Sequence, residues 1–211
     1  MRPHDFLFAL QTQRVMAIVR GADPEAALTT VLTLARTGIP LIEVSLSGTD
    51  AVWVIEQARS VLGPEALLGA GTVVTSEDAW RAAKAGAGYV VTPGLSDAVG
   101  TSRALGLPVL AGAVTPTEVA AALAQDATAV KLFPAGAVGG VELLRALRAP
   151  FPDVPFVPVG GVDVVKAREY LEAGAVAVGV GSPLVGRAAD GDSSGLAGRV
   201  RAFRALTGVV A

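Results

Sequence analysis

Short apolar segments alternate with helical patterns eight times along this chain of 211 residues, and no other feature restricts the possible folds as strongly. The first unit is a β-rich segment at residues 15–20, followed by Asp23, Pro24 and a helical pattern that stops at Gly38. An N-cap residue before a proline and a glycine after the last turn are typical helix boundaries. The same strand-then-helix unit recurs to the end of the sequence.

We predict strands at residues 15–20, 41–46, 68–72, 89–92, 109–113, 128–133, 156–159 and 176–180. We predict helices at residues 3–12, 24–37, 50–62, 76–86, 97–105, 116–125, 141–147, 163–173 and 196–206. Eight strands alternating with eight helices indicate an α/β fold, a closed parallel (β/α)8 TIM barrel, for which about 250 residues are typical. We expect a single barrel domain over residues 1–211, with a short N-terminal helix.

A doubly wound open sheet is the alternative fold. A dinucleotide site on such a sheet would need a glycine fingerprint after the first strand. The sequence there is Arg20, Gly21, Ala22 and Asp23, which lacks that pattern. The loops of a barrel of this length must be short, and only residues 188–195 read as polar and flexible.

The composition excludes several classes of function. Although 52% of the residues are hydrophobic, no apolar run approaches the roughly 18 residues of a membrane span. The apolar cluster at residues 6–10 lacks a basic leader, so we expect a soluble, cytoplasmic protein that binds no membrane. A net charge of −2 without a basic run argues against nucleic acid as a partner. With no Cys and one His, we expect no disulfide, no metal and no cofactor.

One lysine interrupts the apolar segment at residues 129–134. The chain has only three lysines, Lys84, Lys131 and Lys166, although it uses arginine freely. Burial disfavours the charged form of an amine, and a neutral amine is a nucleophile for carbonyl groups, a role that a guanidinium cannot fill. Lys131 is therefore a candidate for covalent catalysis. The alternatives are that it extends to water or pairs with a buried carboxylate.

The second predicted strand carries a candidate acid. Side chains on a strand alternate between its two faces, so Glu43, Ser45 and Ser47 would point into the barrel while their apolar neighbours face the helices. The same alternation turns Lys131 inward. An acid and an amine would then meet across the barrel mouth, either as a catalytic pair or as a buried ion pair without a catalytic role.

Several strands end on glycines or small polar residues, and barrel enzymes place their sites at these ends. The third strand ends at Thr72, and the seventh and eighth end at Gly160–Gly161 and Gly181–Ser182. Glycine-rich ends of strands seven and eight commonly bind phosphate through backbone N–H groups. Alternatively, these glycines only allow tight turns.

Five segments together resemble a known family, the 2-keto-3-deoxy-6-phosphogluconate and phosphogalactonate aldolases (the KDPG/KHG aldolases), which are class I lyases with trimeric barrels. The similarity extends from about residue 16 to residue 184. The segments that carry it are Ile42-Glu43-Val44, Gly69-Ala70-Gly71-Thr72-Val73, Thr92-Pro93-Gly94, Val130-Lys131-Leu132-Phe133-Pro134-Ala135 and Val159-Gly160-Gly161-Val162.

The resemblance implies a role for each matching residue. Lys131 would form a Schiff base with the ketone of a phosphorylated keto acid, and Glu43 would transfer protons. Thr72 would hold the pyruvyl carboxylate, and Phe133 and Pro93 would line the pyruvyl pocket. The resemblance further implies a distal phosphate site made by Gly160, Gly161, Gly181 and Ser182, pyruvate as a product, and a homotrimer.

Two departures from the family pattern concern the substrate. Ser47 stands where the gluconate type carries an arginine, and Arg20, at the end of the first strand as in the galactonate type, could supply the positive charge. Val159 replaces a threonine of the gluconate type. These residues favour the galactonate type or a relaxed specificity.

Other functions stay open at this point. They are an aldolase of the 4-hydroxy-2-oxoglutarate type, a phosphosugar isomerase or epimerase on the same barrel, and a phosphate-ligand binder without activity.

Overall fold

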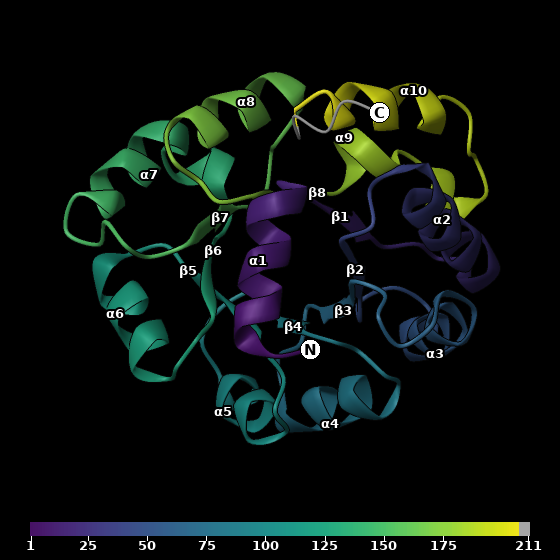
Figure 1. Ribbon diagram of the computed structural model, residues 1–211, viewed down its shortest axis with the longest axis horizontal. Helices are drawn as coiled ribbons and strands as arrows, with labels where there is room; N and C mark the ends of the chain where they lie inside the picture. The colour runs from purple at the N-terminus through teal and green to yellow at the C-terminus, as the bar shows by residue number, and fades with distance from the viewer. Residues whose placement is uncertain (207–211) are drawn as a thin grey trace.

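The computed structural model describes residues 1–206 and shows a ring of helices around eight parallel strands (Figure 1). The strands are β1 (Val15–Val19), β2 (Ile42–Ser45), β3 (Leu68–Gly71), β4 (Val90–Val91), β5 (Val109–Ala113), β6 (Ala129–Leu132), β7 (Phe156–Pro158) and β8 (Val178–Val180). They pair in the order β7-β6-β5-β4-β3-β2-β1-β8. A bridge between Val159 and Gly179 and the bond from the Val176 N–H to the Phe156 carbonyl join the two edges. The predicted closed (β/α)8 barrel is therefore confirmed.

The helices follow the predicted order, with three additional short elements. The α-helices are α1 (Pro3–Gln13), α2 (Pro24–Thr37), α3 (Ala51–Leu62), α4 (Ser76–Lys84), α5 (Asp97–Ala104), α6 (Pro116–Ala124), α7 (Gly140–Arg148), α8 (Val164–Glu172), α9 (Ser182–Val185) and α10 (Leu196–Arg204). Two 3₁₀ turns, η1 (Ala135–Val138) and η2 (Ala188–Asp190), complete the set. Within residues 1–206, no helix is both long enough and apolar enough to cross a membrane.

Local sequence signals set many of the helix boundaries. The Asp23 carboxylate accepts bonds from the N–H groups of Glu25 and Ala26 and thereby caps α2, as the Asp-Pro pair predicted. Gly38 ends this helix in a left-handed conformation, with φ 97°. Reciprocal capping boxes begin α4 at Thr75 and α6 at Thr115. These caps keep the loops short, as a barrel of this length requires.

One prediction about local structure was wrong, and another was wrong in part. The sixth strand was expected to include Phe133 but ends at Leu132, because Phe133 turns out at the mouth and is 36% exposed. Residues 188–195 were expected to be a polar, flexible segment. Residues 190–195 are exposed, but Ala188 and Ala189 are buried, and the backbone of Gly21 packs against Ala189 so closely that a side chain at position 21 would overlap it.

Strand alternation divides the apolar side chains into two layers. Ile42, Val44, Val130 and Leu132 belong to the large core between the strands and the helices. A smaller cluster fills the inside of the barrel. Its buried members are Phe6, Leu10, Met16, Leu41, Tyr89, Val91, Leu110, Ala129, Val157, Val159 and Ala177. The inward and outward positions on β2 and β6 are those that the alternation predicted.

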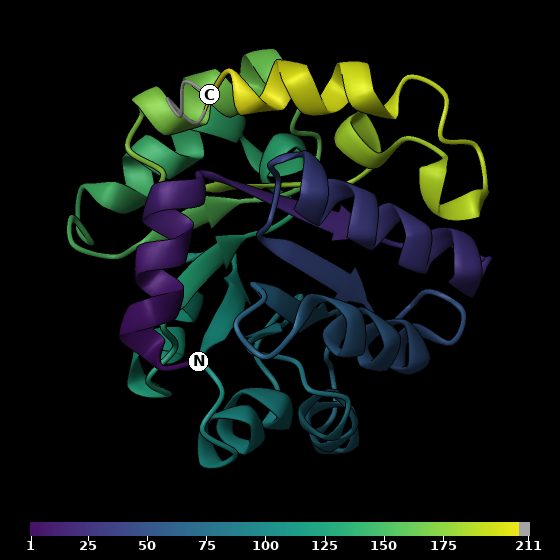
Figure 2. The ribbon, with the colours of Figure 1, turned by 45° about the vertical axis from the view of Figure 1, so that its right-hand side comes forward.

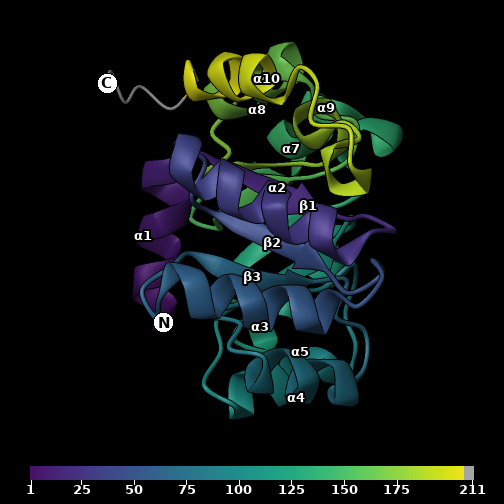
Figure 3. The same ribbon diagram turned by 90° about the vertical axis from the view of Figure 1, so that its right-hand side faces the viewer.

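Helix α1 closes the end of the barrel at which the strands begin (Figures 1 and 2). Figure 3 shows α1 at one end of the barrel, with β1 and β2 pointing away from it. Phe6 on α1 is fully buried, and its ring stacks on that of Tyr89, with 4.3 Å between ring centroids. The opposite end, where the strands finish, is left as the mouth.

We expect Phe6→Ala to lower the free energy of unfolding by about 3–5 kcal/mol, because it leaves a cavity at the closed end of the barrel. Phe8→Ala on the same helix is the matched control, since Phe8 is 60% exposed, and should change stability by less than about 0.5 kcal/mol. Urea unfolding of both variants makes the comparison. Equal losses would contradict the role of α1 as a packed end cap.

Candidate active site

The barrel interior contains one acid and one amine among apolar side chains. Glu43 on β2 is 1% exposed and Lys131 on β6 is 4% exposed. Both lie on the inward face of their strands. Because burying a charge is costly without a partner, the presence of two ionisable groups here needs a chemical explanation.

The Glu43 carboxyl group extends toward the mouth and covers Gly71 on the neighbouring strand. Its Oε1 atom occupies the space that a side chain at position 71 would need, so only glycine fits there. Its Oε2 atom is buried and has no hydrogen-bond partner among residues 1–206. The second oxygen thus remains available as a proton acceptor or donor.

Lys131 lies directly beneath Phe133. The Lys131 Nζ atom is 4.9 Å from the centroid of the Phe133 ring, a distance typical of a cation–π contact. On either side, Lys131 pairs in register with Gly112 on β5 and Val157 on β7. The amine is therefore held inside the barrel, close to the mouth.

The two buried groups interact electrostatically. Burial raises the pKa of the Glu43 carboxyl above its ordinary value, and the positive charges of Lys131 and Arg20 offset part of that rise. A carboxyl group with a raised pKa holds its proton closer to neutrality, as a general acid and base requires.

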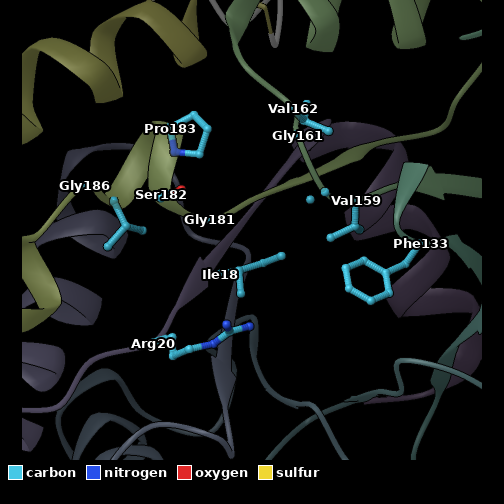
Figure 4. Close-up of a pocket in the computed structure, with 13 residues that line it drawn as sticks. Ile18, Arg20, Phe133, Val159, Gly161, Val162, Gly181, Ser182, Pro183 and Gly186 are labelled. Carbon is cyan, nitrogen blue, oxygen red and sulfur yellow. The ribbon is translucent and has the colours of Figure 1, made fainter. Parts of the chain in front are cut away.

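A cavity of about 290 Å³ opens at the mouth (Figure 4). Arg20, Phe133, Gly160, Gly161, Gly181 and Ser182 are the predicted site residues that line it. In Figure 4, Arg20 and Phe133 stand on different sides of the cavity, and Ile18 points into the space between them. Gly160 and Gly161 have φ angles of 99° and 72°, which only glycine adopts readily.

Within residues 1–206, the other four predicted site residues do not line this cavity. Lys131 and Glu43 are buried, and the Lys131 amine contacts Phe133, which does line the cavity. Thr72 follows β3 and shares a hydrogen bond of 2.8 Å with Ser45. Pro93 follows β4, where its carbonyl group packs against Gly112.

The sequence prediction missed apolar residues of the cavity. Ile18 lies two residues before Arg20 on the same strand face, so the alternation could have identified it. Val185 and Gly186 come from the end of α9, and no local sequence signal marks them as part of a site. The remaining lining residues are Val159, Val162, Gly179 and Pro183.

Comparison with known proteins points to one chemistry. The model of a family described as KDPG and KHG aldolase matches residues 8–195. A probable 2-dehydro-3-deoxy-6-phosphogalactonate aldolase of Rhizobium meliloti is 37% identical over 172 residues, which cover 81% of each chain. The 2-dehydro-3-deoxy-6-phosphogalactonate aldolase of Escherichia coli is 32% identical over 194 residues, which cover 90% of this chain and 94% of that protein.

A solved structure agrees with these relatives. The crystal structure of KDPG aldolase from Legionella pneumophila, with pyruvate captured as a covalent carbinolamine intermediate, aligns with a TM-score of 0.87. The two chains are 27% identical, and the alignment covers 98% of each.

The raised pKa of Glu43 predicts how stability depends on pH. The folded interior favours the neutral carboxyl, so Glu43 opposes folding increasingly as the pH rises from about 4.3, the ordinary value for Glu, through the raised value in the folded state. We therefore expect Glu43→Gln to raise the melting temperature at pH 7, by about 2–4 °C for each kcal/mol gained. This gain should grow as the pH rises above about 4 and should level off above the raised pKa of the folded state.

Glu56→Gln on the exposed face of α3 is the matched control and should change the melting temperature little. Thermal unfolding followed by circular dichroism at a series of pH values measures both variants. A gain for Glu43→Gln that is the same at every pH would show that the buried carboxyl is not the cause.

Proposed function

The chain belongs to the KDPG and KHG aldolase family, and on this premise we propose how its own residues carry out the reaction. The protein is a carbon–carbon lyase, a class I aldolase that cleaves a 2-keto-3-deoxy-6-phospho sugar acid to pyruvate and glyceraldehyde 3-phosphate. The residue assignment rests on one observation. The amine of Lys131 is buried near the mouth cavity, and Lys131 and Glu43 both face the inside of the barrel.

We assign Lys131 as the nucleophile. Its amine adds to the C2 ketone of the substrate, and loss of water gives an iminium ion. The iminium accepts the electron pair of the C3–C4 bond when that bond breaks, so no negative charge accumulates on carbon. The contact with Phe133 supports this assignment, because it fixes the amine at the inner edge of the cavity.

We assign Glu43 as the group that moves protons. Cleavage requires removal of the proton from the C4 hydroxyl, and release of pyruvate requires a proton at C3 of the enamine that remains. The unpartnered Oε2 atom and the raised pKa support both steps, either directly or through one water molecule. Hydrolysis of the resulting iminium then returns the free amine.

We propose that the remaining predicted residues bind the two ends of the substrate. Thr72 and Arg20 would hold the carboxylate end, with Phe133 and Pro93 around the pyruvyl group. Gly160, Gly161, Gly181 and Ser182 would bind the distal phosphate. This assignment is supported by the way the cavity extends from Arg20 and Phe133 to the glycine-rich ends of the seventh and eighth strands.

We further propose a homotrimer in the cytoplasm. The trimer comes from the resemblance to trimeric barrel aldolases. It is supported by Trp80 on α4, which is largely exposed, because subunit interfaces are enriched in aromatic side chains. The cytoplasmic location fits a phosphorylated, charged substrate.

Reduction with borohydride in the presence of pyruvate should attach a pyruvyl group to Lys131, and peptide mass mapping should locate it there. Lys131→Arg should abolish both the adduct and turnover, because a guanidinium cannot form the imine. Lys166→Arg is the matched control, since Lys166 is exposed and paired with Glu169, and should keep full activity. Normal turnover by Lys131→Arg would refute the assignment. A wild-type protein that forms no adduct would favour an isomerase, an epimerase or a binding protein.

Glu43→Gln should lower kcat by about 10²- to 10⁴-fold, because positioned proton transfer contributes about that much to enzymatic rates. The fold should stay intact, as the unfolding experiment above reports independently. Steady-state cleavage of the phosphorylated keto acid gives kcat, with Glu56→Gln again as the control. A kcat within threefold of the wild type would remove Glu43 from the mechanism.

A further inference from the structure

Three hydroxyl groups form a continuous chain at the mouth of the barrel. The Ser45 Oγ atom lies 2.8 Å from the Ser47 Oγ atom and 2.8 Å from the Thr72 Oγ1 atom. Ser45 is the last residue of β2 and is fully buried, whereas Ser47 is exposed. This series of hydrogen bonds therefore leads from the exposed Ser47 hydroxyl, through the buried Ser45 hydroxyl, to Thr72.

Thr72 is held in an unusual conformation at the end of this chain. Its φ angle is 56°, in the left-handed region that β-branched residues rarely adopt. Ser45 pairs in register with Gly71, the residue just before Thr72. The hydroxyl–hydroxyl bond thus adds a second, side-chain connection between the same two strands.

The hydrogen bonds between these hydroxyl groups can share one donor-to-acceptor direction. Each hydroxyl has one proton to donate, so two bonds in series leave one proton free at one end of the chain. If an anion binds beside Thr72, the favoured order is Ser47 donating to Ser45, Ser45 donating to Thr72, and Thr72 donating to the anion. Hydrogen bonds in series polarise one another, which strengthens the last donor.

We propose that Ser45 and Ser47 are positioning residues, which hold the Thr72 hydroxyl group as a proton donor to the carboxylate of the keto acid. This inference rests on the proposed function, in which Thr72 faces that carboxylate. The donor to the carboxylate is then the last member of a polarised series of three neutral hydroxyl groups.

The test uses pyruvate and borohydride, so it does not depend on which sugar acid the enzyme prefers. The rate of adduct formation on Lys131 is measured against pyruvate concentration, which gives a half-saturating concentration and a maximal rate. We expect Ser45→Ala to raise the half-saturating concentration about tenfold, because it removes the hydrogen bond that orients the Thr72 hydroxyl group. The maximal rate should change by less than about threefold.

Three further variants separate positioning from a general structural effect. Ser45→Thr keeps the hydroxyl and should restore most of the affinity. Ser47→Ala, at an exposed site that does not threaten folding, should raise the half-saturating concentration about two- to threefold. Ser76→Ala is the matched control, because it breaks another hydroxyl pair of 2.8 Å, between α4 and Thr101 on α5, and it should change nothing.

A double-mutant cycle gives the decisive result. In a Thr72→Val background, Ser45→Ala should have no additional effect on the half-saturating concentration, because its effect passes through the Thr72 hydroxyl. An equal effect in both backgrounds, or no effect of Ser45→Ala in the wild type, would overturn the inference. Failure of the proposed function looks different, since the wild-type protein itself would then form no adduct.

Discussion

The proposed chemistry depends on the burial of one carboxyl group and one amine inside an apolar barrel. Neither Glu43 nor Lys131 is more than 4% exposed, and the surrounding interior is made of aliphatic and aromatic side chains. Burial destabilises the charged form of the Glu43 carboxyl and raises its pKa, which suits a group that both donates and accepts protons. The fold can bury the two groups because the remaining apolar contacts are extensive. The proposed reaction requires that water be excluded from both groups.

Small residues on β3 make room for the acid. Tyr89 fills the space over Gly69 and the Glu43 carboxyl fills the space over Gly71, so these two glycines of one strand each accommodate a large neighbour. Phe6 on α1 then packs beneath Tyr89. The N-terminal helix, the aromatic pair and the layer that holds Glu43 are thus stacked along the barrel axis, which fills the closed end of the barrel with packed side chains.

At the mouth, some strand ends contribute side chains to the cavity and others contribute backbone groups. Arg20 after β1 and Phe133 after β6 contribute side chains to the cavity, while the glycines after β7 and β8 contribute backbone groups. Parallel strands bring these ends together although they are far apart in the sequence. The hydroxyl series at Ser45 shows that this convergence also builds contacts between neighbouring strand ends.

The amino-acid sequence by itself determined the number and order of strands and helices, and strand alternation determined that Glu43 and Lys131 face inward, because these properties are local and periodic. The five-segment resemblance identified the chemistry. Tertiary structure alone decided where each strand stops, which put Phe133 outside β6 and over the amine. It also decided the packing of residues 188–189 and the part that Val185 and Gly186 play in the cavity. These features depend on contacts between residues distant in the chain, which no local pattern encodes.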